Sequence, residues 1–182
     1  SETLKFKAGQ YIEFLMADKS RRAFSMANAP HESMIELHLR LIEGGKFTSF
    51  VFNEMKEKSI HRIEGPIGQF YLRASDKPIV FIGGGTGFAP IKSIIEDMIF
   101  TKNERKVYLY RGVRSKEDLY MADLVTDWNK KLKYLNYIPV IEDGLSENVR
   151  SGFVHHAVLE DFKNLSDAVS YTHLRAHETS ID

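Results

Sequence analysis

The sequence predicts a β-rich N-terminal domain, of antiparallel barrel or sandwich type, followed by a doubly wound parallel α/β domain. Before residue 75, apolar residues recur at period two in short runs, which is typical of antiparallel strands. After residue 76, short apolar runs alternate with helical patterns, as in a parallel sheet covered by helices. A glycine-rich turn joins the first buried strand of this second part to its helix.

Composition narrows the class of protein. The 182 residues are 43% apolar and 12% aromatic, which is enough for a packed core. Lysine plus arginine equals aspartate plus glutamate at 25 each, so charge gives no case for a nucleic-acid or membrane partner. The absence of cysteine excludes disulfides, a thiol nucleophile and a Cys-ligated iron-sulfur cluster within this chain. With no apolar run long enough for a membrane span, we expect a cytoplasmic protein.

The N-terminal half is expected to hold strands over residues 11–16, 35–42 and 61–64, where apolar and polar residues alternate. One helix interrupts them and begins near Thr48, where the apolar spacing changes from two to three or four. The N-terminus of this helix is a candidate anion site. A glycine- and proline-rich turn at 65–68 closes the half.

The C-terminal half begins after a linker at residues 74–78 and alternates strands with helices. In the first of these helices, isoleucines at 91, 94 and 95 form an apolar stripe, continued by Met98 and Ile99. Lys92, Glu96 and Asp97 are expected to face water. In chain order we expect a strand at 79–82, a helix at 91–100, a strand at 107–110, a helix at 118–132, a strand at 137–141 and a helix at 154–162.

The turn between the first strand and helix of this half contains four glycines around Thr86 within residues 83–87. Glycine lets backbone N–H groups approach a ligand closely, and a helix N-terminus carries partial positive charge, so the turn suits a pyrophosphate. It is not a Walker loop, because no Gly-Lys-Ser/Thr triplet follows, and its order departs from GxGxxG. Taken alone, a tight turn of any α/β sheet explains it equally well.

The N-terminal half has an informative stretch of its own at residues 21–30. Arg22 is of a type that pairs with phosphate through two parallel hydrogen bonds, Phe24 lies on the same strand face, and Ser25 offers a small donor beside it. This set suits a flavin. Taken alone, an ordinary strand with a surface arginine and a core phenylalanine explains it better.

Four motifs together resemble the ferredoxin-NADP reductase superfamily in order and spacing. They are Arg22-x-Phe24-Ser25, Gly44-Gly45-Lys46-Phe47-Thr48, Glu64-Gly65-Pro66-x-Gly68-x-Phe70, and the run from Gly83 to Pro90. Within the superfamily the chain is most similar to flavin reductases and CDP-deoxyglucoseen reductase-like enzymes, through residues 35–40 and 151–162. The resemblance covers almost all of residues 4–169.

The resemblance implies a flavin-binding antiparallel β-barrel at residues 1–75, incomplete at its N-terminus, and an NAD(P)-binding α/β domain at 76–169, incomplete at its C-terminus. Further barrel strands belong before Leu4 in such proteins, and a Cys-Gly-Pro turn after Val169. The polar stretch 170–182 is similar to a translated sequencing adaptor and is expected to be non-native. Because an incomplete barrel exposes a strand edge, we expect this chain as it stands to bind flavin poorly or not to fold alone.

The resemblance also implies roles for particular residues. In the flavin site, Arg22 would hold a phosphate, Phe24 would stack on the isoalloxazine ring and Ser25 would donate near its N5. His38 and Arg40 would contact the sugar-phosphate or adenosine part, although a histidine of the barrel wall is an equally good reading of His38. The helix start would meet the pyrophosphate through Gly45, Lys46 and Thr48.

For the nicotinamide nucleotide, the resemblance implies a cradle made by the turn from Gly84 through Gly85 and Thr86 to Gly87. Thr86 would lie where nicotinamide meets flavin, so Ser25 and Thr86 are the expected catalytic pair. Arg111 and Arg114 would form the second nucleotide contact. Arg114 would reach the adenosine ribose or a 2'-phosphate, unless it is simply a surface arginine in a loop.

The implied function is hydride transfer from NAD(P)H to FAD, with FMN second to it, and passage of electrons to an iron-sulfur protein or cluster. Two alternatives stay open: an NAD(P)H:free-flavin reductase and a non-catalytic flavin- or nucleotide-binding regulatory module. Either nicotinamide nucleotide fits, since Arg111, Arg114 and Ser115 suit a 2'-phosphate whereas Glu117 and Asp118 suit a free ribose. The resemblance favours NADH. No metal site is expected, because His173 and His177 lack a third ligand.

Overall fold

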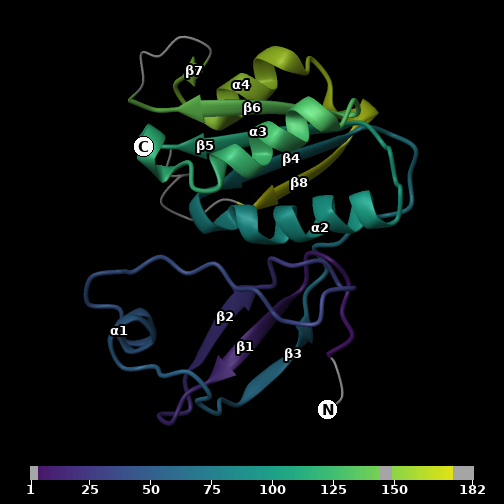
Figure 1. Ribbon diagram of the computed structural model, residues 1–182. Coiled ribbons are helices and arrows are strands. Elements are labelled where there is room, and N and C mark those ends of the chain that lie inside the picture. The colour runs from purple at the N-terminus through teal and green to yellow at the C-terminus, as the bar shows by residue number, and fades with distance from the viewer. Residues whose placement is uncertain (1–3, 144–148, 174–182) are drawn as a thin grey trace. The chain divides into compact units, whose positions relative to one another are not determined.

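The computed structural model describes residues 4–143 and 149–173, and its elements are shown in Figure 1. Contacts between Cα atoms divide the chain into two compact units. Unit 1 comprises residues 1–72 and 89–100, and unit 2 comprises residues 73–88 and 101–182. Unit 1 therefore includes a helical segment, 89–100, that the sequence analysis assigned to the second domain.

Unit 1 contains an antiparallel sheet of order β2-β1-β3, made of β1 (Tyr11–Leu15), β2 (Arg21–Ser25) and β3 (Ile63–Ile67). The prediction of a strand over residues 35–42 is wrong. This extended segment makes one bridge, between Leu37 and Met26, and no ladder among the described residues. β3 also runs through Gly65-Pro66, which the sequence analysis had placed in the closing turn. The alternating pattern predicts an extended backbone, but a strand also needs a neighbour to bond with.

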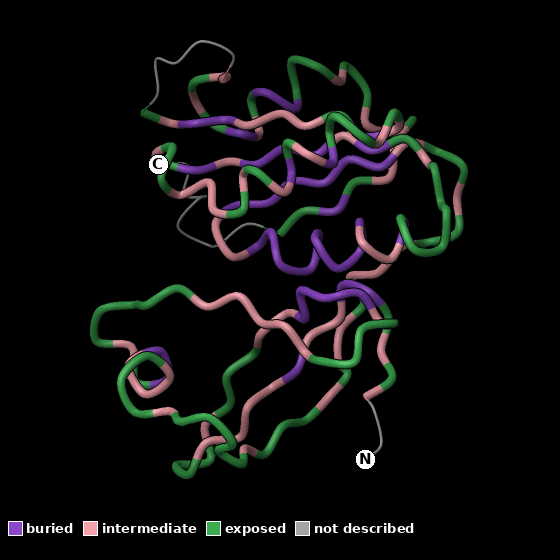
Figure 2. Tube along the Cα trace, viewed as in Figure 1, coloured by how far each residue is buried: buried purple, intermediate pink, exposed green. Residues whose placement is uncertain are grey.

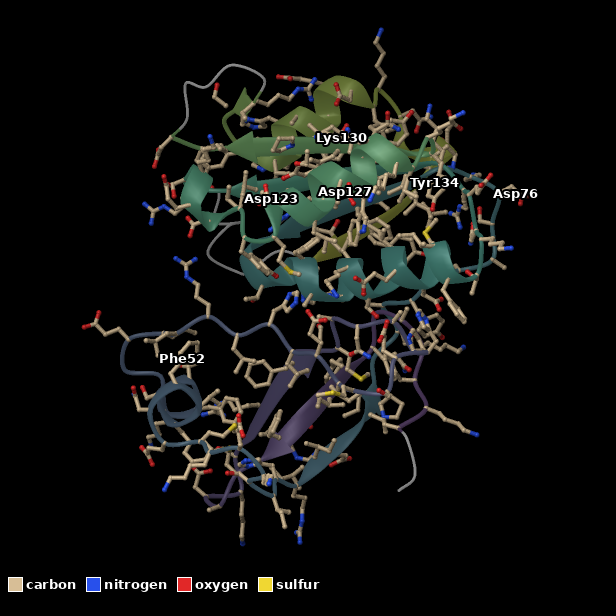
Figure 3. All side chains as sticks on the ribbon, viewed as in Figure 1. Phe52, Asp76, Asp123, Asp127, Lys130 and Tyr134 are labelled. Atoms are coloured by element: carbon tan, nitrogen blue, oxygen red, sulfur yellow. The ribbon has the colours of Figure 1, made fainter. Side chains whose placement is uncertain are left out.

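Helix α1 (Lys46–Asn53) confirms the short helix expected near Thr48 and begins two residues earlier. Its Phe47 is buried in unit 1 together with Ile12 of β1 and Met26. The exposed side of the helix carries Phe52, which is 53% exposed and is labelled in Figure 3. The buried Phe47 side chain thus anchors α1 to the unit.

Helix α2 (Phe88–Phe100) carries the expected apolar stripe, since Ile91, Ile94, Ile95 and Met98 are all at most 1% exposed. The stripe ends earlier than expected, because Ile99 is 38% exposed. The expectation that Lys92 faces water is wrong: only 5% of this residue is exposed. Partners from elsewhere in unit 1, described below, compensate its charge.

Unit 2 is a parallel sheet of order β7-β6-β5-β4-β8, shown in Figure 1. The strands expected in this half are confirmed, and each extends beyond its predicted bounds. Every residue of β4 is buried, as a continuous apolar run predicts for a central parallel strand. The strands are β4 (Ile79–Gly84), β5 (Val107–Val113), β6 (Leu135–Ile141), β7 (Arg150–Ser151) and β8 (Val169–His173).

Two helices of unit 2 pack on opposite faces of this sheet. Helix α4 (Val154–Asp161) buries Val154, Ala157 and Val158 against Val80, Ile82, Tyr110 and Val140. Helix α3 (Ala122–Lys131) places Trp128 near Phe88, whose ring lies over the side chain of Arg111. Because Tyr110 and Arg111 are adjacent in one strand, their side chains point to opposite faces. Helices on both faces of a parallel sheet confirm the doubly wound class, and Figure 2 shows the buried strands between them.

The outer side of α3 is polar. Asp123, Asp127 and Lys130 recur at helical spacing and project away from the sheet in Figure 3. Asp127 also forms an ion pair with Lys131 one turn later, at 2.7 Å. This face therefore meets solvent.

The C-terminal boundary expected at residue 169 falls on the first residue of β8. Residues up to His173 continue this strand, which pairs with β4 in parallel register. The remainder of the tail, 174–182, lies outside the described residues, so its non-native origin stays a prediction. Among the residues that the structure describes, no helix is long and apolar enough to cross a membrane.

Candidate functional site

In unit 1, β2 presents the first predicted site residues. Arg22 and Phe24 lie on one face of the strand, opposite Phe14 and Ile12 of β1. Arg22 is exposed, and its Nη1 donates to the carbonyl oxygen of Arg21 at 2.8 Å. The Phe24 ring is half-buried, with its centroid 5.0 Å from that of Phe47 and 6.0 Å from that of Phe14. Strand, helix and ring contacts hold Phe24 in place while part of its ring stays accessible.

The start of α1 offers backbone donors. Gly45 is the N-cap residue, and no side chain caps the first turn, so the N–H groups of Lys46, Phe47 and Thr48 have no partner within the helix. The Thr48 hydroxyl, expected to contact a pyrophosphate, accepts from the Ile42 N–H at 3.2 Å and lies 3.2 Å from the Gly45 carbonyl oxygen. It thus shapes the turn and leaves the amides for an anion.

A Cβ atom at Gly45 would lie 2.7 Å from Thr48 Oγ1 and 3.0 Å from the carbonyl oxygen of Ile42. Glycine at this position is therefore what allows the turn to close on the Thr48 hydroxyl. Lys46, the next predicted site residue, is exposed at the first position of the helix.

His38 and Arg40 lie in the extended segment that lacks a ladder. The His38 side chain is 10% exposed, and its Nε2 lies 2.8 Å from Oε1 of Glu36. Burial opposes ionisation of Glu36, but hydrogen bonds from His38 and Lys92 outweigh it and lower the pKa of this carboxyl. Arg40 is exposed. The structure thus links His38 to a carboxylate and an amine that the sequence analysis had not connected.

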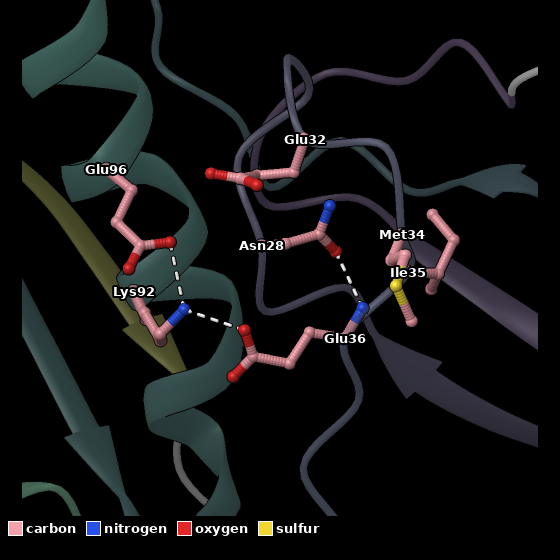
Figure 4. Close-up of a pocket in the computed structure, with 7 residues that line it drawn as sticks. All are labelled: Asn28, Glu32, Met34, Ile35, Glu36, Lys92 and Glu96. Atoms are coloured by element: carbon pink, nitrogen blue, oxygen red, sulfur yellow. Dashed lines mark hydrogen bonds and ion pairs between the residues drawn. The ribbon is translucent and has the colours of Figure 1, made fainter.

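This linkage borders a pocket of unit 1 with a volume of about 450 Å³, shown in Figure 4. Lys92 Nζ lies 2.9 Å from Glu36 Oε2, 2.9 Å from Glu96 Oε2 and 3.3 Å from the carbonyl oxygen of Ala27. Burial raises the pKa of Glu96 although Lys92 opposes the change. Sequence reasoning missed this cluster, although the i, i+4 spacing of Lys92 and Glu96 signals a pair. The pocket is lined by Asn28, Glu32, Met34, Ile35, Glu36, Lys92 and Glu96.

In unit 2, the glycine turn lies at the carboxyl end of β4. The strand ends at Gly84, a 3-10 turn spans Gly85–Gly87 and includes Thr86, and α2 begins at Phe88. Gly85 has a φ of 45°, in the left-handed region that favours glycine. No side chain caps the turn. Backbone N–H groups at a turn of this kind suit a phosphate ligand.

The neighbouring strand β5 brings the predicted arginines to the same edge. Gly83 pairs with Arg111 and Gly84 with Gly112, so Arg114 follows at the carboxyl edge of the sheet, where ligands of open α/β sheets bind. Arg114 is exposed there. Of the two predicted arginines, it is the one whose side chain is exposed.

Arg111 is placed differently from what the resemblance implies, because it is 1% exposed. Its Nη1 donates to the carbonyl oxygen of Tyr120 at 2.8 Å, and its Cζ lies 4.1 Å from the ring centroid of Phe88. Burial lowers the pKa of Arg111, with Tyr137 and Tyr120 opposing the change. The Arg111 side chain is thus enclosed by protein groups.

Each of the two units contains a set of groups that suits a different ligand. In unit 1, an accessible aromatic face, an exposed arginine and uncapped helix amides suit a ligand with a flat ring and a diphosphate. In unit 2, a glycine turn and an arginine at the carboxyl edge of a parallel sheet suit a dinucleotide. Among the residues that the structure describes, no group of three or more histidine, cysteine or acidic side chains could hold a metal ion.

Comparison with protein families assigns both parts of the chain. Residues 1–71 match the oxidoreductase FAD-binding domain, and residues 81–173 match the oxidoreductase NAD-binding domain. The residues that suit a flavin lie in the first match, and the glycine turn, Arg111 and Arg114 lie in the second.

Curated relatives point the same way. The chain is 42% identical over 165 residues to a CDP-6-deoxy-L-threo-D-glycero-4-hexulose-3-dehydrase reductase of Yersinia pestis, covering 90% of this chain and 50% of that protein. It is 32% identical over 173 residues to the ferredoxin--NAD(P)(+) reductase component of the naphthalene 1,2-dioxygenase system of Pseudomonas putida, covering 94% and 53%. The chain thus spans about half the length of these relatives.

A solved structure shares the fold. The Amycolatopsis cytochrome P450 reductase GcoB matches with a TM-score of 0.85 and 31% identity, over 94% of this chain and 54% of that one. The match includes both the antiparallel and the parallel sheet, because it covers nearly the whole chain.

Proposed function

Because the chain belongs to the ferredoxin-NADP reductase superfamily, with an FAD-binding and an NAD-binding oxidoreductase domain, we propose that it is a NAD(P)H-dependent flavin oxidoreductase. Its electrons pass onward to an iron-sulfur protein or cluster. The observation that carries the proposal is the accessible Phe24 ring on β2, in the same unit as the uncapped start of α1.

The chemistry that bound FAD and NAD(P)H supply is hydride transfer between them, followed by release of electrons singly or in pairs. The protein contributes binding and orientation. The Phe24 ring offers a flat apolar face that fixes the ring plane of the flavin, and Ser25, the last residue of β2, supplies a hydroxyl donor. The exposed Arg22 guanidinium binds phosphate, and the first-turn amides of α1 bind the diphosphate with no side chain competing for them.

In unit 2, the amides of Gly85–Gly87 bind the phosphates of the nicotinamide nucleotide, and Thr86 places its hydroxyl at the carboxyl edge of the sheet. Arg114 contacts the adenosine ribose. We propose NADH as the donor, because Glu117 and Asp118 lie in the adjoining 3-10 turn, where their carboxylates suit a free ribose better than a 2'-phosphate.

An iron-sulfur acceptor is supported by the Pseudomonas putida relative, whose name gives ferredoxin as its partner. The chain contains no cysteine, so a Cys-ligated cluster must lie outside these 182 residues. We further propose a cytoplasmic location, because the nucleotide that the protein would oxidise is an intracellular metabolite. Fractionation of cells that express the natural protein tests this location.

An absorbance spectrum of the purified natural protein, rather than of these 182 residues alone, before and after anaerobic addition of NADH tests the function. We expect a visible flavin band that persists through gel filtration and bleaches within the mixing time. A colourless protein that oxidises NADH only with added flavin would establish the free-flavin reductase instead. A protein that neither binds flavin nor oxidises NADH would contradict the proposed function.

Neighbouring arginines provide a matched pair of variants. Arg22→Met removes the proposed phosphate ligand, so we expect FAD to be lost on gel filtration. Arg21→Met is the control, because Arg21 forms ion pairs with Glu13 and Glu64 instead. Equal FAD contents in the two variants would contradict the role of Arg22.

A further inference from the structure

Burying the charged side chain of Arg111 lowers the stability of the fold, so packing alone does not explain why an arginine stands at this position. It is 1% exposed on the α3 face of the sheet, and none of the ion pairs between described residues includes it. Its neighbours are a phenol group, that of Tyr137, and a backbone carbonyl group, that of Tyr120. A buried charge without a counter-ion is costly, and an apolar side chain would fill the space without that cost. The guanidinium therefore needs another explanation.

The contacts of Arg111 supply one, because they reach two segments that are separate in the chain. The guanidinium stacks at 4.1 Å on the ring of Phe88, the residue directly after the turn Gly85–Gly87. Its Nη1 also donates at 2.8 Å to the carbonyl oxygen of Tyr120, six residues after Arg114. The ring of Tyr120 lies 5.1 Å from the same guanidinium.

The second contact is made where α3 begins. Tyr120 precedes Met121, the N-cap residue, which has a left-handed backbone with a φ of 55° and no side-chain cap hydrogen bond. A strained helix start without a cap is poorly fixed by its own residues. The hydrogen bond from Arg111 fixes this point, and with it the end of the loop that carries Arg114.

We propose that Arg111 is a positioning residue for the dinucleotide, holding the glycine turn and the Arg114 loop at one fixed separation. The inference rests on the proposed function, because it assumes that these two segments bind the nucleotide. A planar guanidinium can stack with its face on an aromatic ring and donate hydrogen bonds from its edge at the same time, which the ammonium group of lysine cannot do. The role thus depends on the shape of the guanidinium as well as its charge.

The experiment measures binding of ADP-ribose to the FAD-loaded full-length protein by isothermal titration calorimetry, together with steady-state kinetics and thermal unfolding. For Arg111→Met and Arg111→Lys we expect the dissociation constant of ADP-ribose and the KM for NADH to rise at least tenfold. At saturating NADH, kcat should stay within twofold of the unsubstituted protein, because Arg111 touches neither reacting group. Phe88→Leu, which removes the stacking ring but leaves the charge, should weaken binding in the same direction.

Arg150→Met is the matched control in the same unit. Arg150 bonds Asp161 at 2.6 Å and the carbonyl oxygen of Ala157 at 3.0 Å, and neither partner belongs to the glycine turn or to the loop that carries Arg114. We expect this variant to lose stability but to bind ADP-ribose within twofold of the unsubstituted protein. An equal loss of affinity in Arg150→Met and Arg111→Met would overturn the positioning role.

The remaining outcomes are distinct. If Arg111→Lys binds ADP-ribose as tightly as the unsubstituted protein, charge suffices and the planar contact is not needed, which refutes the proposal. If Arg111→Met does not fold, Phe88→Leu decides: unchanged affinity overturns the role and weakened affinity supports it. If the unsubstituted protein binds no ADP-ribose, the proposed function itself is contradicted. If it binds ADP-ribose and none of the variants changes the dissociation constant, only the positioning role of Arg111 is contradicted.

Discussion

Replacing Lys92 by methionine should destabilise unit 1 in a way that depends on pH. The substitution keeps the volume of the side chain but leaves the carboxylates of Glu36 and Glu96 without the ammonium that lies 2.9 Å from each. Removing one partner of a fully buried pair costs roughly 3–5 kcal/mol. Since the side chains of Glu36 and Glu96 are 41% and 25% exposed, water screens part of this, and we expect a loss of about 2–3 kcal/mol at pH 7.

The pH dependence follows from the same loss. Without the cation, the folded-state pKa of both carboxyls rises, so protonation relieves the repulsion between them. A group whose folded pKa is raised contributes stability that is present at low pH and lost as pH rises through that pKa. Lys92→Met should therefore be less destabilised at pH 5 than at pH 7.

Urea unfolding monitored by circular dichroism at the two pH values measures both effects. Lys131→Met is the control, because Lys131 also forms an i, i+4 ion pair but its side chain is 70% exposed. Such surface pairs contribute less than about 0.5 kcal/mol. A Lys92→Met protein within 0.5 kcal/mol of the parent, or one equally destabilised at both pH values, would refute the reasoning.

Three further predictions address the flavin site and the packing of unit 2. Phe24→Ala should lose FAD on gel filtration whereas Phe24→Tyr keeps it, and retention by both would show that the ring is not needed. In Gly112→Ala the new Cβ would lie 2.7 Å from Cβ of the buried, β-branched Val154, so the urea midpoint should fall with a loss of about 1–3 kcal/mol. The Arg150 hydrogen bond lowers the pKa of Asp161, so this carboxylate stabilises the fold above its unfolded pKa, and that stability fades as pH falls below about 4. Acid titration of Asp161→Asn should show a smaller drop, and identical acid curves would argue against the ion pair.

The sequence alone predicted the doubly wound half because its signals are local. A continuous apolar run predicts a buried strand, and isoleucines at i, i+3 and i+4 predict the helix that follows. The antiparallel half was harder. Apolar and polar residues alternate in the segment 35–42 as they do in β1, yet this segment forms no ladder among the described residues. Pairing depends on a neighbouring strand, which the pattern of the segment itself cannot identify.

In the candidate site, too, some features were predicted from the sequence and others were not. The placement of Arg22 and Phe24 on one strand face, and of the glycine turn before α2, followed from residue type and spacing. The burial of Lys92 and Arg111 did not, because both are charged side chains whose local patterns predict exposure.

What the sequence by itself determined is therefore the class of each half and the residue types at the cofactor turns, since these depend on periodicity and on the backbone freedom of glycine. What only the tertiary structure decided is which charged side chains are buried. Lys92 is buried because the carboxylate of Glu36, distant in the chain, reaches it, and Arg111 because two aromatic rings and one carbonyl group surround its guanidinium. The cost of burying a charge is offset only by partners, and partners are brought together by the fold.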